Sequence, residues 1–298
     1  MIVAIIVTYN PDPGQFKRLL ELCVPQVDAV VVVDNGSSVP VKAWLDACET
    51  TQIIWRPLGE NKGIAAAHNE GIRQARLVNA DYVLIFDHDS APAPDMAERL
   101  LAALKKKQEE GGHVAAVGPC YTDPRRDNPP PFTRIEGLCL KRCAYSKDTP
   151  IVPVDYLVSS GSLIPVAALD AVGEMKEDLF IDYVDVEWGL RANAKGFQSF
   201  GVFSALMEHN LGDETIRIFG RKLAVHSSLR HYYMFRNATW LYTQKDVPLN
   251  WKLVDGARFA VRFVCYALFA KPHLEHIRNM TQGVFDGLRG RLGKKFAE

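Results

Sequence analysis

The stretch "YVLIFDHDS", residues 82–90, is a short run of apolar residues that ends in two carboxylates and an imidazole. A run of this kind is typical of a buried β-strand, and the polar residues would then lie at the strand's carboxyl end. Taken alone, the triplet Asp87-His88-Asp89 says little, because Asp is a common turn residue. Its meaning depends on the pattern of the surrounding 120 residues.

Short runs rich in Val and Ile alternate with helix-compatible stretches over this first part of the chain. The runs are Ile2–Val7, Ala29–Val33, Gln52–Trp55, Tyr82–Phe86 and Val114–Val117. The stretches between them are 15–23, 41–48, 64–76 and 95–107. Near-continuous apolar strands separated by helices indicate parallel strands that are covered on both faces. The pattern therefore predicts an α/β fold.

Polar residues follow three of these strands directly. They are Thr8, Tyr9 and Asn10, then residues 34–37, "DNGS", and then Asp87, His88 and Asp89. In open α/β sheets, ligands bind outside the carboxyl ends of the strands. We therefore expect one ligand site at this edge of the sheet.

The second half of the chain is less regular. Residues 120–150 contain a triple proline and predict a long loop or an insertion, and "YLVSSGSLIP" (156–165) predicts a strand with a tight turn at Gly161. The stretch "FIDYVDVEWGLRANAKG" (180–196) predicts a helix with acids near its start, where they suit the helix dipole. From about Lys222 onward we expect mostly helix.

Composition places the chain among ordinary globular proteins. It has 298 residues, of which 48% are hydrophobic and 23% charged, and its formal net charge is zero. The six cysteines show no zinc-site spacing and fit a reducing compartment. No basic region precedes Ile2 as in a signal peptide, and no uncharged run approaches the roughly 20 residues of a membrane span. We expect a cytoplasmic protein with no nucleic-acid partner.

Asp87 and Asp89 alternate by two residues around His88. If the strand ends there, both carboxylates can face one point, where a hard divalent cation that also binds phosphate oxygens could sit. The alternative is a capping role, with Ser90 as the cap of a helix in the following "APAPDMAERL".

Asp34 admits two interpretations as well. A carboxylate at this position can accept the N3–H of a uracil or thymine ring, or it can form an Asx turn with the residues after it. In "GENKGIAAAHNEG" (59–71), glycines flank Asn61 and polar ends could meet a ribose or a diphosphate. Neither GxxxxGK nor GxGxxG occurs in this stretch, so a P-loop and a dinucleotide site are not supported.

Three acids, Asp182, Asp185 and Glu187, fall within six residues. One of them could act as a general base that removes a proton from a hydroxyl group. The alternative is a charged helix N-terminus. His209 follows a predicted strand; it is either structural or a further metal ligand.

Six stretches together match one family in order. They are "VTYNP" (7–11), "VVVDNGS" (31–37), "GENKGIAAAHNEG" (59–71), "FDHDS" (86–90), "SSGSLIP" (159–165) and "FIDYVDVEWGLR" (180–191). On these motifs, residues 1–240 resemble the family 2 glycosyltransferases, which are inverting enzymes of the GT-A fold. The resemblance is strongest to bacterial rhamnosyltransferases that act on polysaccharide precursors such as those of O-antigen and lipopolysaccharide.

The resemblance implies a role for each matching residue. The nucleotide-sugar site would include Thr8, Tyr9, Asn10, Asp34, Asn61, Gly63, Asn69, Asp87 and His88. Asp87 and Asp89 would form the DxD motif, with Asp89 and His209 as ligands of Mg²⁺ or Mn²⁺. Asp185 would be the catalytic base. The family's usual Glu-Asp pair reads Val184-Asp185 here, so the first acid is missing.

The implied fold is a GT-A domain with a Rossmann-like nucleotide-binding part and a mixed central sheet. Residues 1–120 would bind the nucleotide sugar, and residues 121–240 would carry the acceptor and catalytic half. Beyond the resemblance, the sequence predicts a helical, basic tail over residues 241–298.

The implied activity is transfer of a sugar, L-rhamnose from dTDP-rhamnose, to a hydroxyl group of a glycan or lipid-linked saccharide. Another UDP- or dTDP-sugar donor and a non-catalytic nucleotide-sugar-binding homologue are the alternatives. A nucleotidyltransferase of related fold would need a basic, glycine-rich loop after the first strand, whereas "TYNPDPGQF" (8–16) carries no base.

The tail has a charge of its own, because residues 252–298 hold nine Lys and Arg against four Asp and Glu. In "ARFAVRFVCYALFA" (257–270), one helical face would carry Phe259, Phe263, Tyr266 and Ala270, with scattered bases after it. We expect this helix to lie on the inner face of the plasma membrane with that face toward anionic lipid. The alternative is that the aromatic residues close the core or form the contact of a homo-oligomer.

Overall fold

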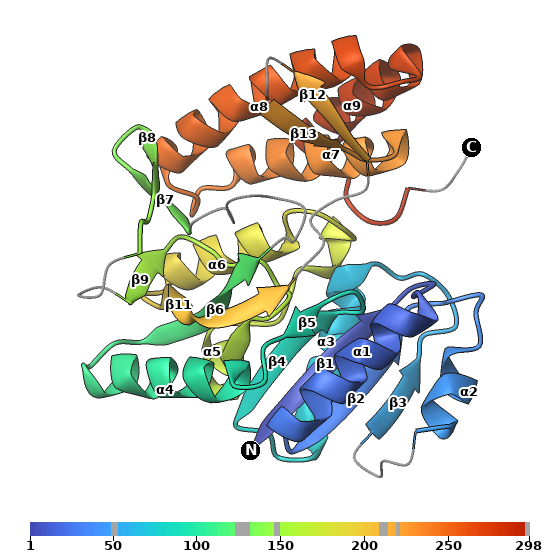
Figure 1. Ribbon diagram of the computed structural model, residues 1–298. Helices are drawn as coiled ribbons and strands as arrows, with labels where there is room; N and C mark the ends of the chain where they lie inside the picture. The colour runs from blue at the N-terminus through green and yellow to red at the C-terminus, as the bar shows by residue number, and fades with distance from the viewer. Residues whose placement is uncertain (49–52, 123–131, 146–149, 209–213, 219–220, 296–298) are drawn as a thin grey trace.

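Strand β1 (Ile2–Thr8) lies at the centre of the first half of the sheet, parallel to β2 (Ala29–Asp34) and to β4 (Tyr82–Asp87). The computed structural model describes residues 1–48, 53–122, 132–145, 150–208, 214–218 and 221–295. Strand β3 (Ile53–Pro57) pairs in parallel with β2 and forms one edge. The predicted parallel strands are therefore present (Figure 1).

Beyond β4 the sheet becomes mixed. The strand order is β3-β2-β1-β4-β10-β6-β11-β5, and β9 pairs with β11. The bounds of the added strands are β5 (Ala91–Pro92), β6 (Val114–Thr122), β9 (Ile151–Val154), β10 (Leu163–Pro165) and β11 (Gln198–Glu208). β10 is antiparallel to both neighbours, whereas β6 and β11 are parallel to each other.

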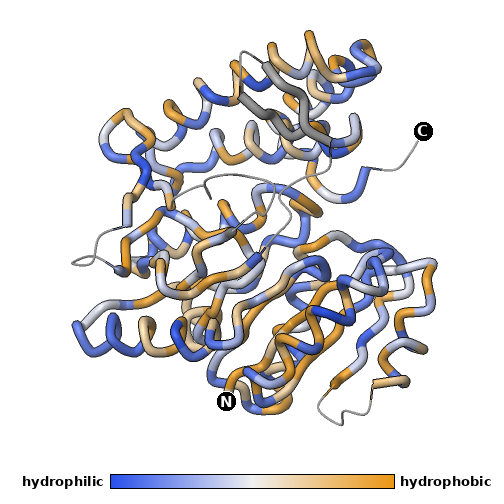
Figure 2. Tube along the Cα trace, in the orientation of Figure 1, coloured by the Kyte–Doolittle hydropathy of each residue, from blue (hydrophilic) through white to orange (hydrophobic). Residues whose placement is uncertain are grey.

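Helices cover both faces of the sheet because alternate residues of each strand point to opposite sides. Ala4 and Ile6 pack in one core cluster, whereas Val3 and Ile5 pack in the other. The first cluster lies under α1 (Pro13–Cys23), α2 (Val41–Asp46) and α4 (Met96–Glu109). The second lies under α3 (Ile64–Leu77), α5 (Val166–Val172) and α6 (Val184–Ala194). In Figure 2, β1, β2 and β4 are coloured mostly as hydrophobic.

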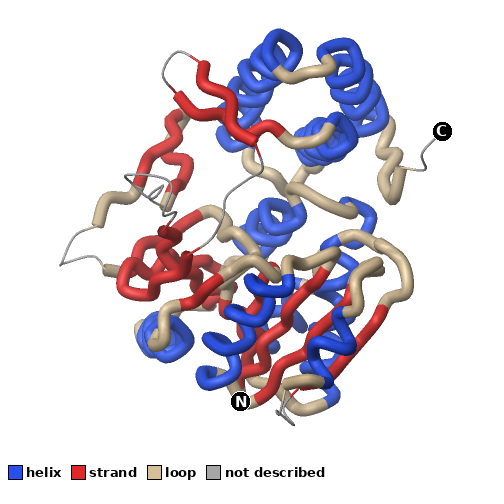
Figure 3. The backbone as a smooth tube through the Cα atoms, turned by 45° about the vertical axis from the view of Figure 1, so that its right-hand side comes forward, coloured by secondary structure: helices blue, strands red, loops and turns tan. Residues whose placement is uncertain are grey.

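Three helices form a layer beyond α6: α7 (Ser228–Thr243), α8 (Leu249–Phe269) and α9 (His273–Leu288). Figure 3 shows them grouped at the end of the molecule away from the sheet. Side chains of all three form one core cluster around Phe235, Tyr266 and Met280. The expected boundary at residue 240 falls inside α7, so the layer begins before it.

The remaining elements are short. Two 3₁₀ helices, η1 (Val24–Gln26) and η2 (Glu177–Leu179), and the hairpin of β7 (Thr133–Glu136) and β8 (Cys139–Arg142) connect larger units. A second hairpin, β12 (Glu214–Ile218) with β13 (Arg221–Val225), precedes α7. The prediction of helix from Lys222 was therefore wrong by a few residues, because that residue pairs across the hairpin.

In the part of the chain that the structure describes, a helix able to cross a bilayer is not found. The face of α8 that was expected to meet lipid packs inward instead. Tyr266 and Ala270 belong to the core cluster with α7 and α9, and the partly buried Phe259 and Phe263 pack against it.

Candidate active site

The ends of β1, β2 and β4 meet at one edge of the sheet, as their sequence predicts. Thr8 is paired in register with Asp34, and Val7 with Asp87. The Thr8 hydroxyl donates a hydrogen bond to Asp34 Oδ1 over 2.9 Å, and both side chains are buried. The first two polar groups of the predicted site are therefore in direct contact.

The loop after β2 is held by hydrogen bonds from two sides. Asp34 Oδ2 accepts from the Ser37 backbone N–H (3.0 Å). This oxygen forms the Asx turn that was the alternative interpretation of Asp34. Asn10 Oδ1 accepts from the backbone N–H and the hydroxyl of Ser38 (2.8 and 2.9 Å). Tyr9 lies beside them with 46% of its surface exposed. The loop thus presents a fixed carboxylate and an exposed aromatic ring.

Two glycines let three loops come together. A Cβ on Gly36 would lie 2.5 Å from the backbone of Glu60, and a Cβ on Gly63 would lie 2.6 Å from the Phe180 carbonyl oxygen. Both have positive φ, 82° and 90°. Asn61 joins the same junction, because its Oδ1 accepts from the Gly63 N–H (3.0 Å). The contact with Phe180 connects the first half of the chain to the loop that precedes α6.

Asp87 is fixed by a residue that the sequence did not single out. Its backbone N–H donates to Ser160 Oγ over 3.0 Å, and Ser160 Oγ also lies 2.7 Å from Ser90 Oγ. Ser90 is buried and α4 begins only at Met96, so the alternative in which Ser90 caps that helix was wrong. The Tyr121 hydroxyl donates to the Ser160 carbonyl oxygen (2.6 Å).

The three acids before and within α6 have different surroundings. Asp182 is paired with Arg230, and Glu187 is buried and paired with Arg191. Among the residues that the structure describes, Asp185 has no ion-pair partner. Burial raises the pKa of Asp185 to about 6, the negative charges of Asp182 and Asp87 add to the rise, and a hydrogen bond from the Val186 N–H opposes it.

Such a carboxylate is suited to proton transfer. A general base works best when its pKa lies near the operating pH, and burial beside like charges is the usual way to raise the pKa of an Asp to that range. Ile85 near the end of β4 and Asp185 near the start of α6 line the same small cavity, so these two segments converge. The structure thus brings a candidate base to the same edge as the DxD carboxylates.

The backbone before α6 adopts an uncommon conformation. Phe180, Asp182 and Tyr183 have φ values of 64°, 62° and 62°, in the left-handed region that side chains other than Gly rarely occupy. Each such residue costs about 1–3 kcal/mol and persists only where its surroundings hold it. We call residues 178–183 the base loop, because it leads directly to Asp185.

Helix α7 supplies much of what holds the base loop. The Asn237 amide donates to the carbonyl oxygens of Leu179, Ile181 and Asp182 at 2.8–2.9 Å. Arg236, which is 1% exposed, donates to the carbonyl oxygens of Asp178 and Leu179 at 3.1 and 2.9 Å. One helix therefore satisfies carbonyl groups along most of the loop.

Helix α8 holds the end of the base loop. Asp255 Oδ2 accepts from the hydroxyl groups of Tyr183 (3.1 Å) and Tyr242 (2.7 Å). Burial raises the pKa of the Tyr183 hydroxyl well above its ordinary value, and the nearby Asp255 carboxylate adds to the rise. The C-terminal helices are therefore part of the structure that places Asp185.

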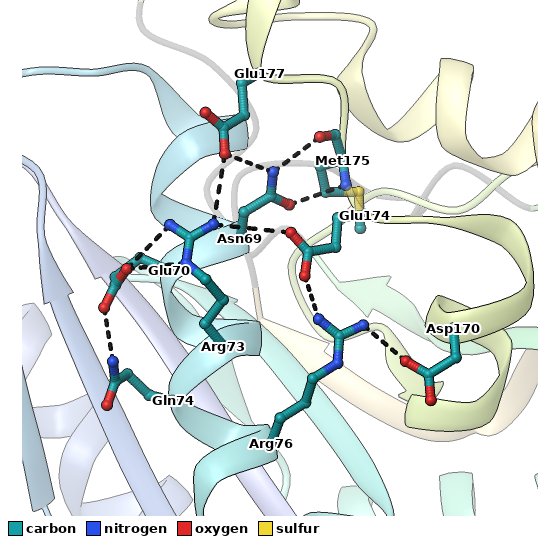
Figure 4. Close-up of polar contacts among 9 residues, drawn as sticks. All are labelled: Asn69, Glu70, Arg73, Gln74, Arg76, Asp170, Glu174, Met175 and Glu177. Atoms are coloured by element: carbon teal, nitrogen blue, oxygen red, sulfur yellow. Dashed lines mark hydrogen bonds and ion pairs between the residues drawn. The ribbon is translucent and has the colours of Figure 1, made fainter.

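Asn69 lies outside the junction of the loops. Its amide donates to the Met175 carbonyl oxygen and to Glu177 Oε1, and accepts from the Met175 N–H, each at 2.9 Å (Figure 4). Arg73 and Arg76 extend the same contact to acids of α5 and of the segment after it. Because these contacts occupy the buried Asn69 side chain, we do not retain it as a nucleotide ligand.

The donor atoms at the end of β4 suit a hard divalent cation. Mg²⁺ and Mn²⁺ prefer oxygen ligands, and Mg²⁺ is commonly held by one or two carboxylates together with substrate phosphates. Asp87 and Asp89 are partly buried and supply such carboxylates, and His88 between them is partly buried as well. No group of three or more metal-binding side chains occurs in the described residues. The third expected ligand, His209, lies outside them.

The sequence of this site has clear relatives. A model of glycosyl transferase family 2 matches residues 3–147. The dTDP-rhamnosyl transferase RfbF of Shigella flexneri is 32% identical over 294 residues, which span 98% of this chain and 97% of that protein. The chain belongs to glycosyltransferase family 2. This glycosyltransferase is also 23% identical to the low-salt glycan biosynthesis hexosyltransferase Agl10 of Haloferax volcanii, over 97% of this chain and 92% of that one.

Solved structures confirm the fold of the glycosyltransferase as GT-A. Residues 1–349 of S. aureus TarS in complex with UDP-GlcNAc match with a TM-score of 0.62 at 18% identity, over 97% of this chain and 80% of that one. GalNAc-T7 with UDP, GalNAc and Mn²⁺ matches with a TM-score of 0.63 at 12% identity. The glycosyltransferase spans 97% of its own length in that match and 56% of the GalNAc-T7 chain.

Several residues of the site could not be found from the sequence. Ser160, Arg230, Arg236, Asn237 and Asp255 act through contacts with segments far away in the chain. The "SSGSLIP" motif indicated the region of Ser160, but nothing in the sequence of α7 separates the buried Arg236 from a surface arginine. Only Asp185 and the residues at the strand ends carried a local signal.

Proposed function

We propose that this enzyme is an inverting rhamnosyltransferase. It would transfer L-rhamnose from dTDP-rhamnose to a hydroxyl group of a glycan or lipid-linked glycan that is a precursor of a cell-surface polysaccharide. The donor sugar rests on the full-length similarity to the dTDP-rhamnosyl transferase of Shigella flexneri. The observation that carries the chemistry is the state of Asp185: a carboxylate with a raised pKa at the edge where β4 ends.

The proposed reaction is one displacement at the anomeric carbon. Asp185 accepts the proton of the acceptor hydroxyl while its oxygen forms the new bond to that carbon. The bond from the anomeric carbon to the diphosphate breaks on the opposite side, and its electron pair leaves with dTDP. Because attack and departure occur on opposite faces, the configuration at this carbon inverts.

The other residues would bind and orient the donor. Asp34, fixed by Thr8, would accept the N3–H of the pyrimidine, and Tyr9 and Asn10 would line the base pocket. Asn61 and Gly63 would lie near the ribose, and Asp87 and His88 near the diphosphate. When Mg²⁺ or Mn²⁺ is bound by Asp89, with Asp87 and His209, it would neutralise charge on the leaving diphosphate.

A screen of nucleotide sugars tests the proposal. Purified enzyme is incubated with dTDP-rhamnose, UDP-glucose, UDP-GlcNAc or GDP-mannose, with Mg²⁺ or Mn²⁺, and release of the nucleoside diphosphate is measured. The expected result is metal-dependent release from dTDP-rhamnose above all others. Release mainly from a different sugar would replace the donor, and no release from any of them with acceptor lipids present would favour the non-catalytic alternative.

The matched control for this screen is a pair of variants in one segment. Asp185→Asn should abolish release, whereas Asp178→Asn should not, because the Asp178 side chain is 67% exposed. Both changes remove one carboxylate, so a difference between them reports the position of the base.

A further inference from the structure

Helix α8 exposes apolar side chains and buries its charged ones, which is the reverse of an ordinary surface helix. All of its exposed side chains are apolar: Leu249, Leu253, Ala257, Ala260, Val261, Val264, Leu268 and Phe269. Its charged residues are all partly or fully buried: Lys252, Asp255, Arg258 and Arg262. A surface helix normally turns its charged face to solvent and its apolar face to the core.

The exposed residues form one continuous stripe. Positions 253, 257, 261, 264 and 268 follow the spacing of three and four residues that places side chains on one helical face. At about 1.5 Å per residue, the stripe is roughly 22 Å long. Val261 is 63% exposed and Leu268 is 61% exposed, so neighbouring elements do not cover it. We call this row of five side chains the α8 stripe.

The α8 stripe lies outside the core clusters, because the opposite face of the helix forms the core contacts. Phe259 and Phe263 pack against Phe235 of α7, and Asp255 binds Tyr183 of the base loop. Figure 1 shows α8 on the side of α7 away from the sheet. Contiguous apolar surface of this kind marks an interaction site in a soluble protein.

Bases lie beside both ends of the α8 stripe along the chain. Lys245 precedes α8, and Lys271 and Arg278 follow it; all three are exposed, as are the acids Asp246 and Glu275. At the turn from α8 to α9, the exposed side chains of Phe269 and Leu274 flank Lys271. Apolar side chains next to bases match the boundary between acyl chains and anionic headgroups.

We propose that the α8 stripe, with the exposed bases Lys245, Lys271 and Arg278 beside its ends, forms a docking surface for an anionic lipid bilayer, on which α8 lies parallel to the membrane plane. The inner face of the same helix binds the base loop, so docking would set the active site at a fixed distance from the lipid headgroups. The proposal depends on the exposed side chains of α8 and not on the donor or on the role of Asp185.

Vesicle co-sedimentation of the full chain tests the surface. Wild-type protein should sediment with vesicles that contain phosphatidylglycerol, much less with phosphatidylcholine alone, and salt should release it because exposed charges are screened. The double variant Val261→Asp/Val264→Asp should lower binding by about tenfold or more, since it places charge in the apolar stripe. Lys271→Glu should lower binding to anionic vesicles only.

The control variant is Leu77→Asp, at the end of α3, where the side chain is 73% exposed. It makes a similar change outside the stripe and should leave vesicle binding unchanged. Thermal unfolding should be the same for all these variants, because the substituted side chains are exposed.

Three results would overturn the proposal. The stripe variant could sediment as wild type does, or binding could be indifferent to lipid charge. Sedimentation equilibrium could also show a wild-type dimer that Val261→Asp/Val264→Asp converts to monomer while neither protein binds vesicles. The stripe would then be an interface between copies of the chain.

Discussion

Arg230, at the start of α7, binds the carboxylate of Asp182 in the base loop, with Nε at 3.2 and 3.3 Å from its two oxygens and Nη2 at 3.1 Å from one of them. Asp182 lies three residues before Asp185, whose pKa its charge helps to raise. The ion pair therefore links the helical layer to the protonation of the candidate base.

Substitutions of this ion pair should shift the pH dependence of turnover in opposite directions. Asp182→Asn removes a negative charge near Asp185, which should lower the pKa of Asp185 and move the acid limb of the pH–rate profile to lower pH. Arg230→Gln leaves the charge of Asp182 uncompensated and should move the limb to higher pH, with a loss of turnover of about 10- to 100-fold if the base is displaced. Shifts in the same direction, or none, would show that the pair only stiffens the loop.

Asp185→Asn should lower turnover by about 10²–10⁴-fold and yet stabilise the fold near neutral pH. The pKa of Asp185 is raised to about 6 in the folded state, so its contribution to stability is present below the unfolded pKa and is lost as the pH rises through 6. At about pH 7.5 the free energy of unfolding of the variant should therefore exceed that of the wild type by on the order of 1–2 kcal/mol, and its melting temperature should be higher. Both differences should vanish near pH 4.

Calorimetry at both pH values, with Asp178→Asn as the control, measures this effect. If Asp185→Asn kept the turnover of the wild type, the base would have to be another group. If it were no more stable than the control at neutral pH, the carboxylate would not be strained by its surroundings.

Gly63→Ala should impair the enzyme far more than Gly59→Ala. Both glycines have positive φ, 90° and 78°, so both substitutions carry the left-handed penalty of about 1–2 kcal/mol. A Cβ on Gly59 would meet no atom within 4 Å, whereas a Cβ on Gly63 would lie 2.6–2.8 Å from Phe180 in the base loop. The melting temperature and kcat/KM of the two variants make the comparison, and equal losses would mean that the loop moves aside freely.

Asp89→Ala should weaken donor binding in a metal-dependent manner. Loss of a carboxylate ligand should raise the Kd for dTDP in the presence of Mn²⁺ by about tenfold or more, and a chelator should remove the difference between the two proteins. Asp185→Asn serves as the control, because a base that acts on the acceptor should leave dTDP binding nearly intact. Titration calorimetry measures both, and the same Kd with and without chelator in the wild type would rule out a metal at this site.

The position of Asp34 predicts that the nucleobase of the donor is a pyrimidine. UDP and dTDP should bind at least about tenfold more tightly than GDP, a difference of about 1.4 kcal/mol. Asp34→Asn should narrow this preference, because an amide cannot present two acceptor oxygens to Thr8, Ser37 and the ring N3–H together. Asp28→Asn, at the opposite end of β2, should not change it, and equal affinity of the wild type for GDP and dTDP would disprove the assignment.

The sequence alone was enough to predict the first half of the fold and the sheet edge at which the candidate site lies. Runs such as Tyr82–Phe86 are apolar on both strand faces, and this local property identifies a strand buried between two helical layers. Because parallel strands end at one edge, the positions of Thr8, Asp34 and Asp87 follow from their place in the chain. The acid-rich start of α6 was readable in the same local way.

Only the tertiary structure decided which of those acids is left without an ion-pair partner among the described residues, and which face of α8 is exposed. The partners of Asp182 and Tyr183, Arg230 and Asp255, stand 48 and 72 residues further along the chain, and no local pattern encodes such pairings. Helix α8 is apolar on two faces, so its hydrophobicity alone cannot say which face packs. Packing against Phe235 and Met280 buried the aromatic face and left the Leu and Val stripe outside. Contacts between distant segments, and not residue type, therefore determine which face of α8 is buried.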